Sequence, residues 1–540
     1  MTPIRNFLPG TWPIFFFRFG RPTRIQQLSV PVITQGHDAL LVSPAATGKT
    51  EAALAPLVER HCLDAPGQLS IIYVAPTRAL VNNIYGRFKD VLAESGLRMG
   101  IKTGDSPGIS EKHPPDILIT TPESLDSMLG RKQRLLRNIK AVVLDEIHLL
   151  DNSYRGDQLI VLLRRLRARG IDFQLVAMSA TVPDPQGIAG RYFQTPPRIL
   201  LNEQVRPIGL KLVTSTEDAV NTMKERGWYK VVWFCNSRRM VETIATHLKD
   251  GLWRSDRVFV HHASLPKARR LEVESALQNL QTGICVATTT LELGIDIGDV
   301  DAVVLQEPPL DVSSYSQRTG RGCRRKEGMT AIGVAETEDG SEAFRELNRM
   351  ANNGVLSGEP YIADPSVAVQ QVFSILFERP EGVSVPKLAS LTQGLVETRD
   401  LDDILEHLNN EGWVQPGPMG RVMGTTQLMD FAVRGMIHSN IPDFGTWSLI
   451  DVRSSRSVGK IDAMASPGMI ITVGGMMWKI RSMDTTHWQL FVSRVPKGAI
   501  VTAFKFRPGF GAFYSYLPDS VKIRLAEKIE NPFLDEPDIR

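Results

Sequence analysis

The first 205 residues alternate short apolar runs with longer amphipathic stretches. Apolar runs with the length of buried strands occupy residues 39–42, 70–74, 117–120, 141–144 and 174–178. The stretches between them have the periodicity of helices. Strands that alternate with helices are typical of a parallel sheet that helices cover on both faces. We therefore predict an α/β domain over residues 1–205.

A second block with the same alternation covers residues 206–355. Its predicted strands are residues 230–234, 257–261, 283–287 and 302–305. The two blocks predict tandem α/β domains of one kind, and we find no further internal repeat.

The pattern changes after residue 355. Residues 368–377, 385–391 and 401–409 have the spacing of amphipathic helices, and residues 412–414 and 424–426 could be short strands. These elements suit a winged-helix domain over residues 356–440. A generic helical packing domain has nearly equal support from the periodicity.

The last block, residues 441–540, contains short apolar runs that glycine interrupts. The runs at 447–452, 470–473, 476–480 and 490–492 predict a small antiparallel β-rich domain. From residue 517 the chain is polar, and we expect one helix there and a disordered end.

A candidate phosphate-binding loop follows the first predicted strand. Residues 43–50 read SPAATGKT and lead into a predicted helix. In this layout backbone N–H groups at the helix N-terminus bind phosphate oxygens, Lys49 reaches the β- and γ-phosphates, and the Thr50 hydroxyl binds Mg²⁺. The residues predicted to bind the nucleotide here are Ala46, Thr47, Gly48, Lys49, Thr50 and Glu51. Ala46 stands where the usual pattern has a second glycine.

An acidic pair follows the fourth predicted strand. Asp145 can hold the same Mg²⁺, and Glu146 can orient a water for attack on the γ-phosphate. Taken alone, Gly-Lys-Thr is common by chance, and Asp-Glu is commonly the solvated end of a strand. Together, in this order and each behind its own strand, they predict ATP and Mg²⁺ as cofactors.

Polar segments follow the other strands of the first block. In a parallel sheet such segments share one edge, where ligands bind. Hydroxyls and an arginine in residues 76–80, 121–124 and 179–181 could hold a sugar-phosphate backbone, although Thr-Pro and Ser-Ala-Thr are also ordinary turn and helix-cap sequences. Gln26, ahead of the loop, offers a donor and an acceptor that match the Hoogsteen edge of adenine.

Two arginine clusters stand out. Arg318, Arg321 and Arg324 recur at three-residue spacing, which would place them on one face of a helix. Such a face can be merely solvated. The sharper hypothesis is that Arg321 and Arg324 reach the γ-phosphate as arginine fingers. The cluster at residues 164–169 is, by itself, interpreted as a solvated face.

The composition is that of an ordinary globular chain. Its 540 residues carry a net charge of +3, so nucleic-acid binding cannot be argued from the total charge. The four cysteines form no C-x-x-C pair, which argues against zinc or iron–sulfur sites and suits a reducing cytoplasm. No secretory signal or membrane span is visible, and we expect no membrane partner.

The ordered set of motifs resembles the superfamily 2 helicases. The matching segments are Gln26, the phosphate loop, and residues 76–80, 121–123, 145–148, 179–181, 234–238, 261–265, 288–296 and 317–324. Within that superfamily the chain is most similar to the Lhr (large helicase-related) group. The segments that carry this likeness are residues 262–265, 286–296, 441–443 and 474–478.

This resemblance implies two RecA-like P-loop domains, a winged helix and a β-rich domain around a single strand. It implies that Gln26 reads adenine, that Asp296 contacts the ribose and Gly294 also binds the nucleotide, and that Arg321 and Arg324 complete the catalytic set with Lys49 and Glu146. The residues it assigns to nucleic acid are Thr77, Arg78, Thr103, Gly104, Thr121, Pro122, Asn236, Arg238 and Thr288.

The expected activity is ATP-driven 3′-to-5′ movement on single-stranded DNA, with unwinding of DNA duplexes or RNA–DNA hybrids. Two alternatives stay open: an RNA helicase, and a nucleotide-gated clamp without processive unwinding. Because the chain stops soon after the β domain begins, far short of a typical Lhr core, we expect weaker strand separation or a protein partner for it.

Overall fold

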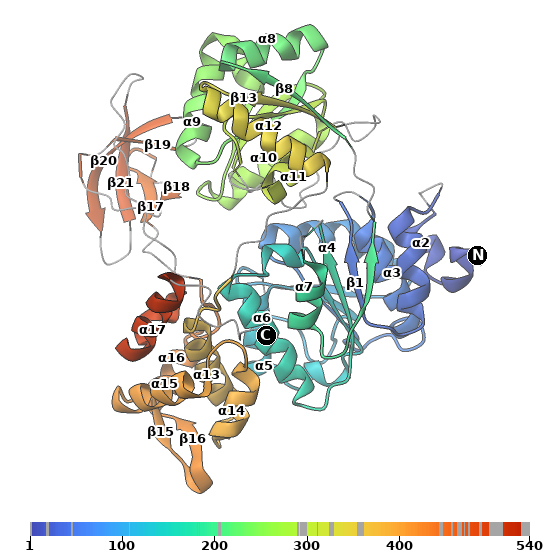
Figure 1. The fold of residues 1–540 in the computed structure, drawn as a ribbon, viewed down its shortest axis with the longest axis vertical. Coiled ribbons are helices and arrows are strands. Elements are labelled where there is room, and N and C mark those ends of the chain that lie inside the picture. Colours follow the sequence, from blue (N-terminus) through green and yellow to red (C-terminus); the bar gives the residue numbers. More distant parts are fainter. Residues whose placement is uncertain are drawn as a thin grey trace, which may run out of the picture. The chain divides into compact units, whose positions relative to one another are not determined.

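The chain folds into two compact units, each assembled from separate parts of the sequence (Figure 1). The structure is a computed structural model that describes residues 3–530, except 18–20, 45–46, 107, 181, 183, 203–206, 289–290, 292–299, 310–311, 323–328, 354–360, 442–446, 455–456, 462–466, 469, 474–475, 485–488 and 496–510. The first unit comprises Met1–Glu203, Gly358–Pro442 and Gly509–Arg540, and the second comprises Gln204–Ser357 and Asp443–Pro508. The four predicted domain limits stay predictions.

A seven-stranded parallel sheet of order β3-β4-β2-β5-β6-β1-β7 forms the centre of the first unit. Its strands are β1 (Ala39–Val42), β2 (Ile71–Val74), β3 (Met99–Lys102), β4 (Ile117–Thr120), β5 (Ala141–Leu144), β6 (Gln174–Ser179) and β7 (Arg198–Leu201). The sheet confirms the predicted α/β class. Strands β3 and β7 escaped the prediction because they lie at the two edges, where their side chains are only partly buried or exposed.

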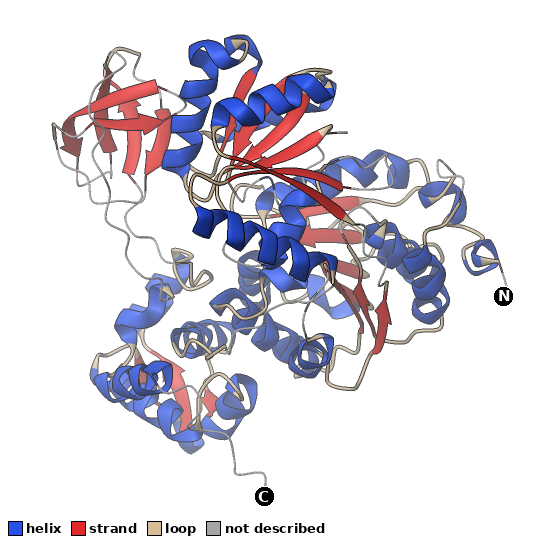
Figure 2. Ribbon diagram, turned by 45° about the horizontal axis from the view of Figure 1, so that its top comes forward, coloured by secondary structure: helices blue, strands red, loops and turns tan. Residues whose placement is uncertain are grey.

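Helices cover both faces of this sheet (Figure 2). They are α1 (Trp12–Phe15), α2 (Arg24–Thr34), α3 (Lys49–His61), α4 (Arg78–Ala93), α5 (Pro122–Arg131), α6 (Tyr154–Arg167) and α7 (Pro185–Tyr192). Because strand side chains alternate between faces, Leu41 and Tyr73 join the core under α2 to α4, while Leu40 and Ile72 join the core under α5 to α7.

A six-stranded parallel sheet of order β10-β11-β9-β12-β13-β8 forms the centre of the second unit. Its strands are β8 (Ile208–Val213), β9 (Lys230–Phe234), β10 (Val258–His261), β11 (Gly283–Ala287), β12 (Ala302–Leu305) and β13 (Met329–Val334). Its helices are α8 (Thr216–Arg226), α9 (Arg238–His247), α10 (Lys267–Asn279), α11 (Val312–Thr319) and α12 (Glu338–Asn352). The tandem α/β prediction is confirmed, although β8 and β13 were not anticipated.

Residues 361–441 form a helical module that packs on α5 and α6 of the first unit. Its elements are α13 (Ser366–Glu378), β14 (Val383–Ser384), α14 (Val385–Thr392), α15 (Thr398–Asn410), β15 (Val414–Pro416), β16 (Arg421–Gly424) and α16 (Thr426–Val433). The three strands form an antiparallel sheet of order β14-β16-β15. The predicted strand at 424–426 ends earlier, because the Thr425 side chain caps α16. Helix α17 (Asp519–Glu530) packs against α15 of this module.

A buried polar network joins the helical module to α5 and α6. Arg165, only 2% exposed, donates hydrogen bonds to Asp126 Oδ1 and Glu378 Oε2, each over 2.6 Å. Arg169 also donates to Glu378, and His438 lies 2.8 Å from Asp126. The interpretation of residues 164–169 as a solvated face is therefore wrong for Arg165, which the helical module covers.

The remaining strands form a separate five-stranded sheet of order β18-β17-β21-β20-β19 in the second unit. They are β17 (Trp447–Asp451), β18 (Ser457–Ile461), β19 (Ile470–Val473), β20 (Met476–Asp484) and β21 (Gln489–Arg494). The predicted β-rich character is confirmed, but the sheet is not fully antiparallel, because β17 and β21 pair in parallel. Trp447 and Trp478 are buried in its core, so neither presents an exposed ring on which a base could stack.

Among the described helices, none is both long and apolar enough to cross a membrane. Cys62, Cys235 and Cys285 are buried and are not joined in disulfides.

Candidate active site

The predicted chemistry of the first unit gathers at the carboxyl edge of its sheet. The phosphate loop follows β1, Asp145 follows β5, and β6 lies between these two strands. The helix after the loop, α3, begins at Lys49, behind Gly48 in the left-handed region at φ 82°. A Cβ on Gly48 would lie 2.3 Å from the Gln26 amide nitrogen, so a side chain there would displace Gln26.

Lys49 connects the loop to the acidic pair. Its ammonium group donates to the carbonyl oxygens of Ser43 (2.7 Å) and Pro44 (3.3 Å) and lies 3.9 Å from Glu146 Oε2. The side chain is only 7% exposed. The structure thus brings together the cation and the carboxylate that the sequence predicted would act on one phosphate.

Asp145 is buried beside a second carboxylate. Tyr73 donates its hydroxyl to Asp145 Oδ2 over 2.6 Å, and the Glu146 N–H donates to Oδ1 over 2.9 Å. Burial, followed by the neighbouring Glu146 charge, raises the pKa of Asp145 to about 7. Thr50 interacts with the same Tyr73 hydroxyl. The Thr50 hydroxyl and the Asp145 carboxylate thus share Tyr73 as a partner. Because the negative charge of Asp145 is unfavourable at this buried site, the two oxygen ligands fit a divalent cation.

Glu146 adopts an unusual backbone conformation for a residue with a side chain. Its φ of 43° lies in the left-handed region, where a non-glycine residue is strained. This conformation turns the chain sharply after β5 and leaves the carboxylate beside Lys49. The position suits the water-orienting role predicted for Glu146.

His148 links the ends of β5 and β6. Its Nδ1 accepts a hydrogen bond from the Ala180 N–H over 3.2 Å and lies 3.3 Å from Ser179 Oγ. Burial lowers the pKa of His148 to about 4, so the imidazole is neutral near pH 7. The 3.6 Å approach of Glu146 Oε2 to Nδ1 is therefore not an ion pair. Sequence reasoning gave His148 no separate role, although its place in the Asp-Glu-Ile-His segment was a signal.

Gln26 holds the loop from the other side. Its amide oxygen accepts from the Thr23 N–H (2.9 Å), and its amide nitrogen donates to the Gly48 carbonyl (3.2 Å). Thr23 itself donates to the Thr47 carbonyl over 2.7 Å. Both functional groups of Gln26 are thus engaged within the protein, and its role in reading adenine stays a prediction.

Glu51 is buried and forms an ion pair with Arg87 of α4. The pair ties the helix that follows the loop to a neighbouring helix on the same face. Arg87 was not anticipated from the sequence, because the residues lie in separate helices and no local motif connects them.

The six residues assigned to nucleic acid in the first unit lie at the ends of β2, β3 and β4, which are adjacent in the sheet. Arg78 forms an ion pair with Asp105 over 2.6 Å, and a Cβ on Gly104 would lie 2.8 Å from its guanidinium group. Thr77 caps α4 by accepting from the Leu80 N–H. Thr121 precedes α5, which begins at Pro122. Thr103 is buried and bonds Ser106.

The second unit places its predicted contact residues at the carboxyl ends of β9 and β11. Asn236 accepts a hydrogen bond from Arg318 over 2.7 Å and donates to the Pro308 carbonyl over 2.9 Å. Arg238 hydrogen-bonds Ser264, and Thr288 follows β11. Their contacts with phosphates stay predictions.

Arg318 and Arg321 do not lie in one helix, although their spacing predicted a common helical face. Helix α11 ends at Thr319, so Arg321 lies beyond the helix, and the prediction of a shared helical face is wrong for Arg318 and Arg321. Arg318 is buried against the Phe234 ring, and Arg321 is only 5% exposed. The predicted site residues that lie outside the described residues are Ala46, Gly294, Asp296 and Arg324.

Two family descriptions match the chain. Residues 23–188 match the DEAD/DEAH box helicase family, and residues 214–326 match the helicase conserved C-terminal domain. These matches cover the phosphate loop and the acidic pair in the first unit, and Asn236, Arg238 and Arg321 in the second.

Curated relatives extend this likeness. The chain is 32% identical over 368 residues to an ATP-dependent helicase Lhr-Core protein 2 of Thermococcus barophilus, a match that covers 60% of this chain and 42% of the relative. It is 34% identical over 341 residues to an ATP-dependent helicase Lhr-Core of Methanocaldococcus jannaschii, covering 56% and 40%. The match thus spans less than half the length of these relatives.

Solved structures show the same fold. The Mycobacterium smegmatis helicase Lhr bound to ssDNA and AMP-PNP superposes with a TM-score of 0.69 at 24% identity, covering 80% of this chain and 62% of that one. The DUF1998 helicase MrfA bound to DNA superposes with a TM-score of 0.72 at 21% identity, covering 91% and 73%.

Proposed function

The chain belongs to the superfamily 2 helicases of the Lhr type, and from this premise we propose that it hydrolyses ATP to move in the 3′-to-5′ direction along single-stranded DNA and to unwind duplexes. The observation that carries the proposal is the convergence of Lys49, Asp145 and Glu146 at one edge of the first sheet. This edge is where parallel α/β sheets bind their ligands.

ATP binding follows from the loop. The N-terminus of α3 and the ammonium of Lys49 would hold the phosphates, and Lys49 would exchange its carbonyl contacts for phosphate oxygens. Thr50 and Asp145 would hold Mg²⁺, which neutralises charge on the phosphates when it is bound. Glu146 would orient the attacking water.

Nucleic acid would bind beside the nucleotide. Residues at the ends of β2, β3 and β4 are hydroxyls, backbone groups at helix starts and one arginine, which suit phosphate oxygens. Arg78 forms an ion pair with Asp105 in this structure, so a phosphate group would compete with the Asp105 carboxylate for the Arg78 guanidinium. Contacts with phosphates alone carry no base information, so binding would be sequence-independent and salt-sensitive.

Other parts of the chain would serve the same motor. We propose that Arg321 acts on the γ-phosphate and that residues 361–441, with four α-helices and a three-stranded antiparallel sheet, act as a winged helix. In that scheme hydrolysis removes the γ-phosphate, so Arg321 loses its contact with it. The loss of this contact couples ATP hydrolysis to movement.

The proposal predicts distinct effects of Glu146→Gln. The variant keeps Lys49 and Asp145 and should bind ATP normally, while ATP turnover falls by about a hundredfold or more because no carboxylate orients the water. Nucleotide binding by fluorescence and turnover by phosphate release measure the two effects. Unchanged hydrolysis would remove Glu146 from its role.

Strand displacement tests the full activity. Duplexes with a 3′ tail or a 5′ tail, built from DNA, RNA or both, should be unwound when the tail is 3′ single-stranded DNA, and the Glu146→Gln variant should release no strand. Release only from RNA tails would favour an RNA helicase. ATP hydrolysis without any strand release would favour a nucleotide-gated clamp.

A further inference from the structure

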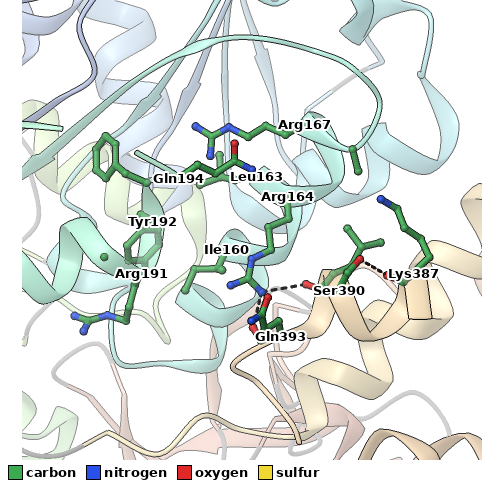
Figure 3. A pocket seen from close by; sticks show the side chains of 14 residues that line it. Ile160, Leu163, Arg164, Arg167, Arg191, Tyr192, Gln194, Lys387, Ser390 and Gln393 are labelled. Atoms are coloured by element: carbon green, nitrogen blue, oxygen red, sulfur yellow. Dashed lines mark hydrogen bonds between the residues drawn. The ribbon is translucent and has the colours of Figure 1, made fainter. Parts of the chain in front are cut away.

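A polar cavity lies at the junction of α6, α7 and α14, inside the first unit (Figure 3). Its volume is about 530 Å³, and its charged lining residues are Arg164, Arg167, Arg191 and Lys387. Arg164 donates to the carbonyl oxygens of Leu391, in the last turn of α14, and of Gln393, just after that helix. Lys387 projects from α14, on the facing helix. No carboxylate is among the described residues that line this cavity.

A second cavity adjoins the first. Its volume is about 710 Å³, and the two share Arg167 and Gln194 in their linings. The second adds Arg60, Lys140 and Arg198. We call the cationic side chains of both cavities, Arg60, Lys140, Arg164, Arg167, Arg191, Arg198 and Lys387, the basic belt.

The basic belt concentrates positive charge. The two linings contain its seven cationic side chains and two carboxylates, those of Asp38 and Asp172. This excess of positive charge is larger than the net charge of +3 on the whole chain. Arg191 is partly offset by an ion pair with Asp151, which lies outside the linings. Burial and the nearby Arg60 and Lys140 lower the pKa of His61 at the same site, which agrees with a positive potential there.

The basic belt lies away from the nucleotide. Most residues of the second cavity lie just before β1, β5, β6 and β7 or begin those strands, and Arg60, His61 and Arg167 end α3 and α6, so the cavity lies at the amino edge of the sheet. The phosphate loop and Asp145 lie at the carboxyl edge. Helix α6 starts beyond that carboxyl edge and ends with Arg164 and Arg167 at the amino edge. A ligand on the basic belt would therefore leave the ATP site open.

The residues that line the two cavities suit a nucleic-acid duplex better than a single strand. The aromatic lining residues Phe173, Tyr192 and Phe193 are all buried, so they offer no exposed ring on which a base could stack. Single-strand binding commonly relies on such stacking. A duplex presents its phosphates outward and needs cations alone.

We propose that the basic belt binds the phosphate backbone of a duplex arm, outside the path of the translocated strand. This inference rests on the proposed function, because it assigns the belt to the duplex that the motor approaches. By holding the duplex on the first unit and the helical module, which pack together, the belt would keep the junction near the motor.

The test uses the full chain with a tailed duplex and with the isolated single-stranded tail. Lys140→Gln/Lys387→Gln removes one cation from each cavity, and the matched control Lys89→Gln/Lys112→Gln removes two exposed lysines that line neither. Fluorescence anisotropy over a range of salt concentrations gives the Kd for each substrate.

We expect the belt variant to bind the tailed duplex more weakly, with the slope of log K against log salt reduced by roughly 2, and to bind the tail alone like the wild type. The control should match the wild type on both substrates. The charge reversal Lys140→Glu/Lys387→Glu should weaken duplex binding further.

Equal weakening on both substrates, or unchanged duplex binding, would overturn the proposal. A third contrary result would be that pyrophosphate stabilises the wild type against heat but not the belt variant, while duplex binding is unchanged in that variant. The ligand of the basic belt would then be a small phosphorylated molecule. If the wild type bound neither substrate, the proposed function itself would fail. If the wild type bound the tail and the belt variant changed nothing, the belt proposal alone would fail.

Discussion

At the scale of single residues, the proposed nucleotide site contains one fully buried tyrosine. Tyr73 donates a 2.6 Å hydrogen bond to Asp145 and also interacts with Thr50, the two residues proposed to hold Mg²⁺. A charge-assisted hydrogen bond of this kind orients the carboxylate and favours its ionised form. Tyr73 therefore acts as a positioning residue, since no group of its own is assigned to metal or phosphate.

Tyr73→Phe should raise the Mg²⁺ concentration for half-maximal ATPase activity by about ten- to a hundredfold, because a lost hydrogen bond to a charged group is worth roughly 1.5–3 kcal/mol. A Mg²⁺ titration of steady-state hydrolysis measures the shift. Tyr315→Phe, which removes a buried hydroxyl bonded to Asn348 in the second unit, is the control. An unchanged Mg²⁺ dependence would show that Tyr73 only fills space.

Asp157 makes stability depend on pH. Burial raises the pKa of Asp157 to about 6 from 3.8, although the Tyr361 hydroxyl and the Asp364 N–H both donate to it. A folded-state pKa above the unfolded value means that the stabilisation is complete below about pH 4 and is lost as the pH rises through 6. Ionised Asp157 is therefore unfavourable at pH 8.

Asp157→Asn should raise the unfolding free energy at pH 8 by up to about 3 kcal/mol, and the gain should shrink below pH 5. Asparagine keeps an oxygen that can accept from Tyr361. Thermal unfolding at several pH values measures the effect, with exposed Asp64→Asn as the control. A gain that did not vary with pH would reject this assignment.

At the scale of elements, a buried ion network joins α13 to α5 and α6. Glu378 receives hydrogen bonds from both Arg165 and Arg169, and Asp126 receives them from Arg165 and Ser374. Such charges are tolerated in a core only because they are paired. The network makes the packing of the helical module on the first sheet specific, so the two should move together.

Glu378→Ala should destabilise the first unit by roughly 3–5 kcal/mol, because it removes the buried carboxylate that pairs with both Arg165 and Arg169. Denaturant unfolding with a probe in the helical module measures the loss. Glu346→Ala removes a carboxylate from an exposed pair with Arg349 and should leave the midpoint unchanged. Equal, small effects of the two variants would mean that the network contributes no specificity.

At the scale of the whole molecule, the proposed motor requires groups from both units to act on one nucleotide. The first supplies Lys49, Asp145 and Glu146, and the second would supply Arg321. Hydrolysis that depends on a residue from the second unit is the property that would couple the chemistry to movement of one unit against the other.

Arg321→Ala should lower nucleic-acid-stimulated ATPase turnover by about 10³-fold, while binding to a single strand without nucleotide is unchanged. Arg345→Ala, on an exposed face of α12 in the same unit, is the control and should be fully active. Equal turnover of the two variants would mean that Arg321 does not act on the phosphate, and the two-unit motor would lose its basis.

The sequence by itself determined the α/β class, the tandem repeat of that class and the placement of Lys49, Asp145 and Glu146 behind their strands at one edge of the sheet. These features depend on local signals: apolar runs that must be buried, and a loop and an acidic pair whose chemistry follows directly on a strand. Edge strands such as β3 and β7 lacked this signal because they are not fully buried.

Only the tertiary structure decided which distant residues became partners. Tyr73 with Asp145, Glu51 with Arg87, and Arg165 with Glu378 are joined by packing between separate elements, which no local pattern encodes. It also ended α11 before Arg321 and paired β17 with β21 in parallel. The physical reason is that spacing along the chain decides which residues are neighbours within one helix or strand. Contacts between elements depend instead on how the whole chain buries its apolar surfaces and pairs its buried charges.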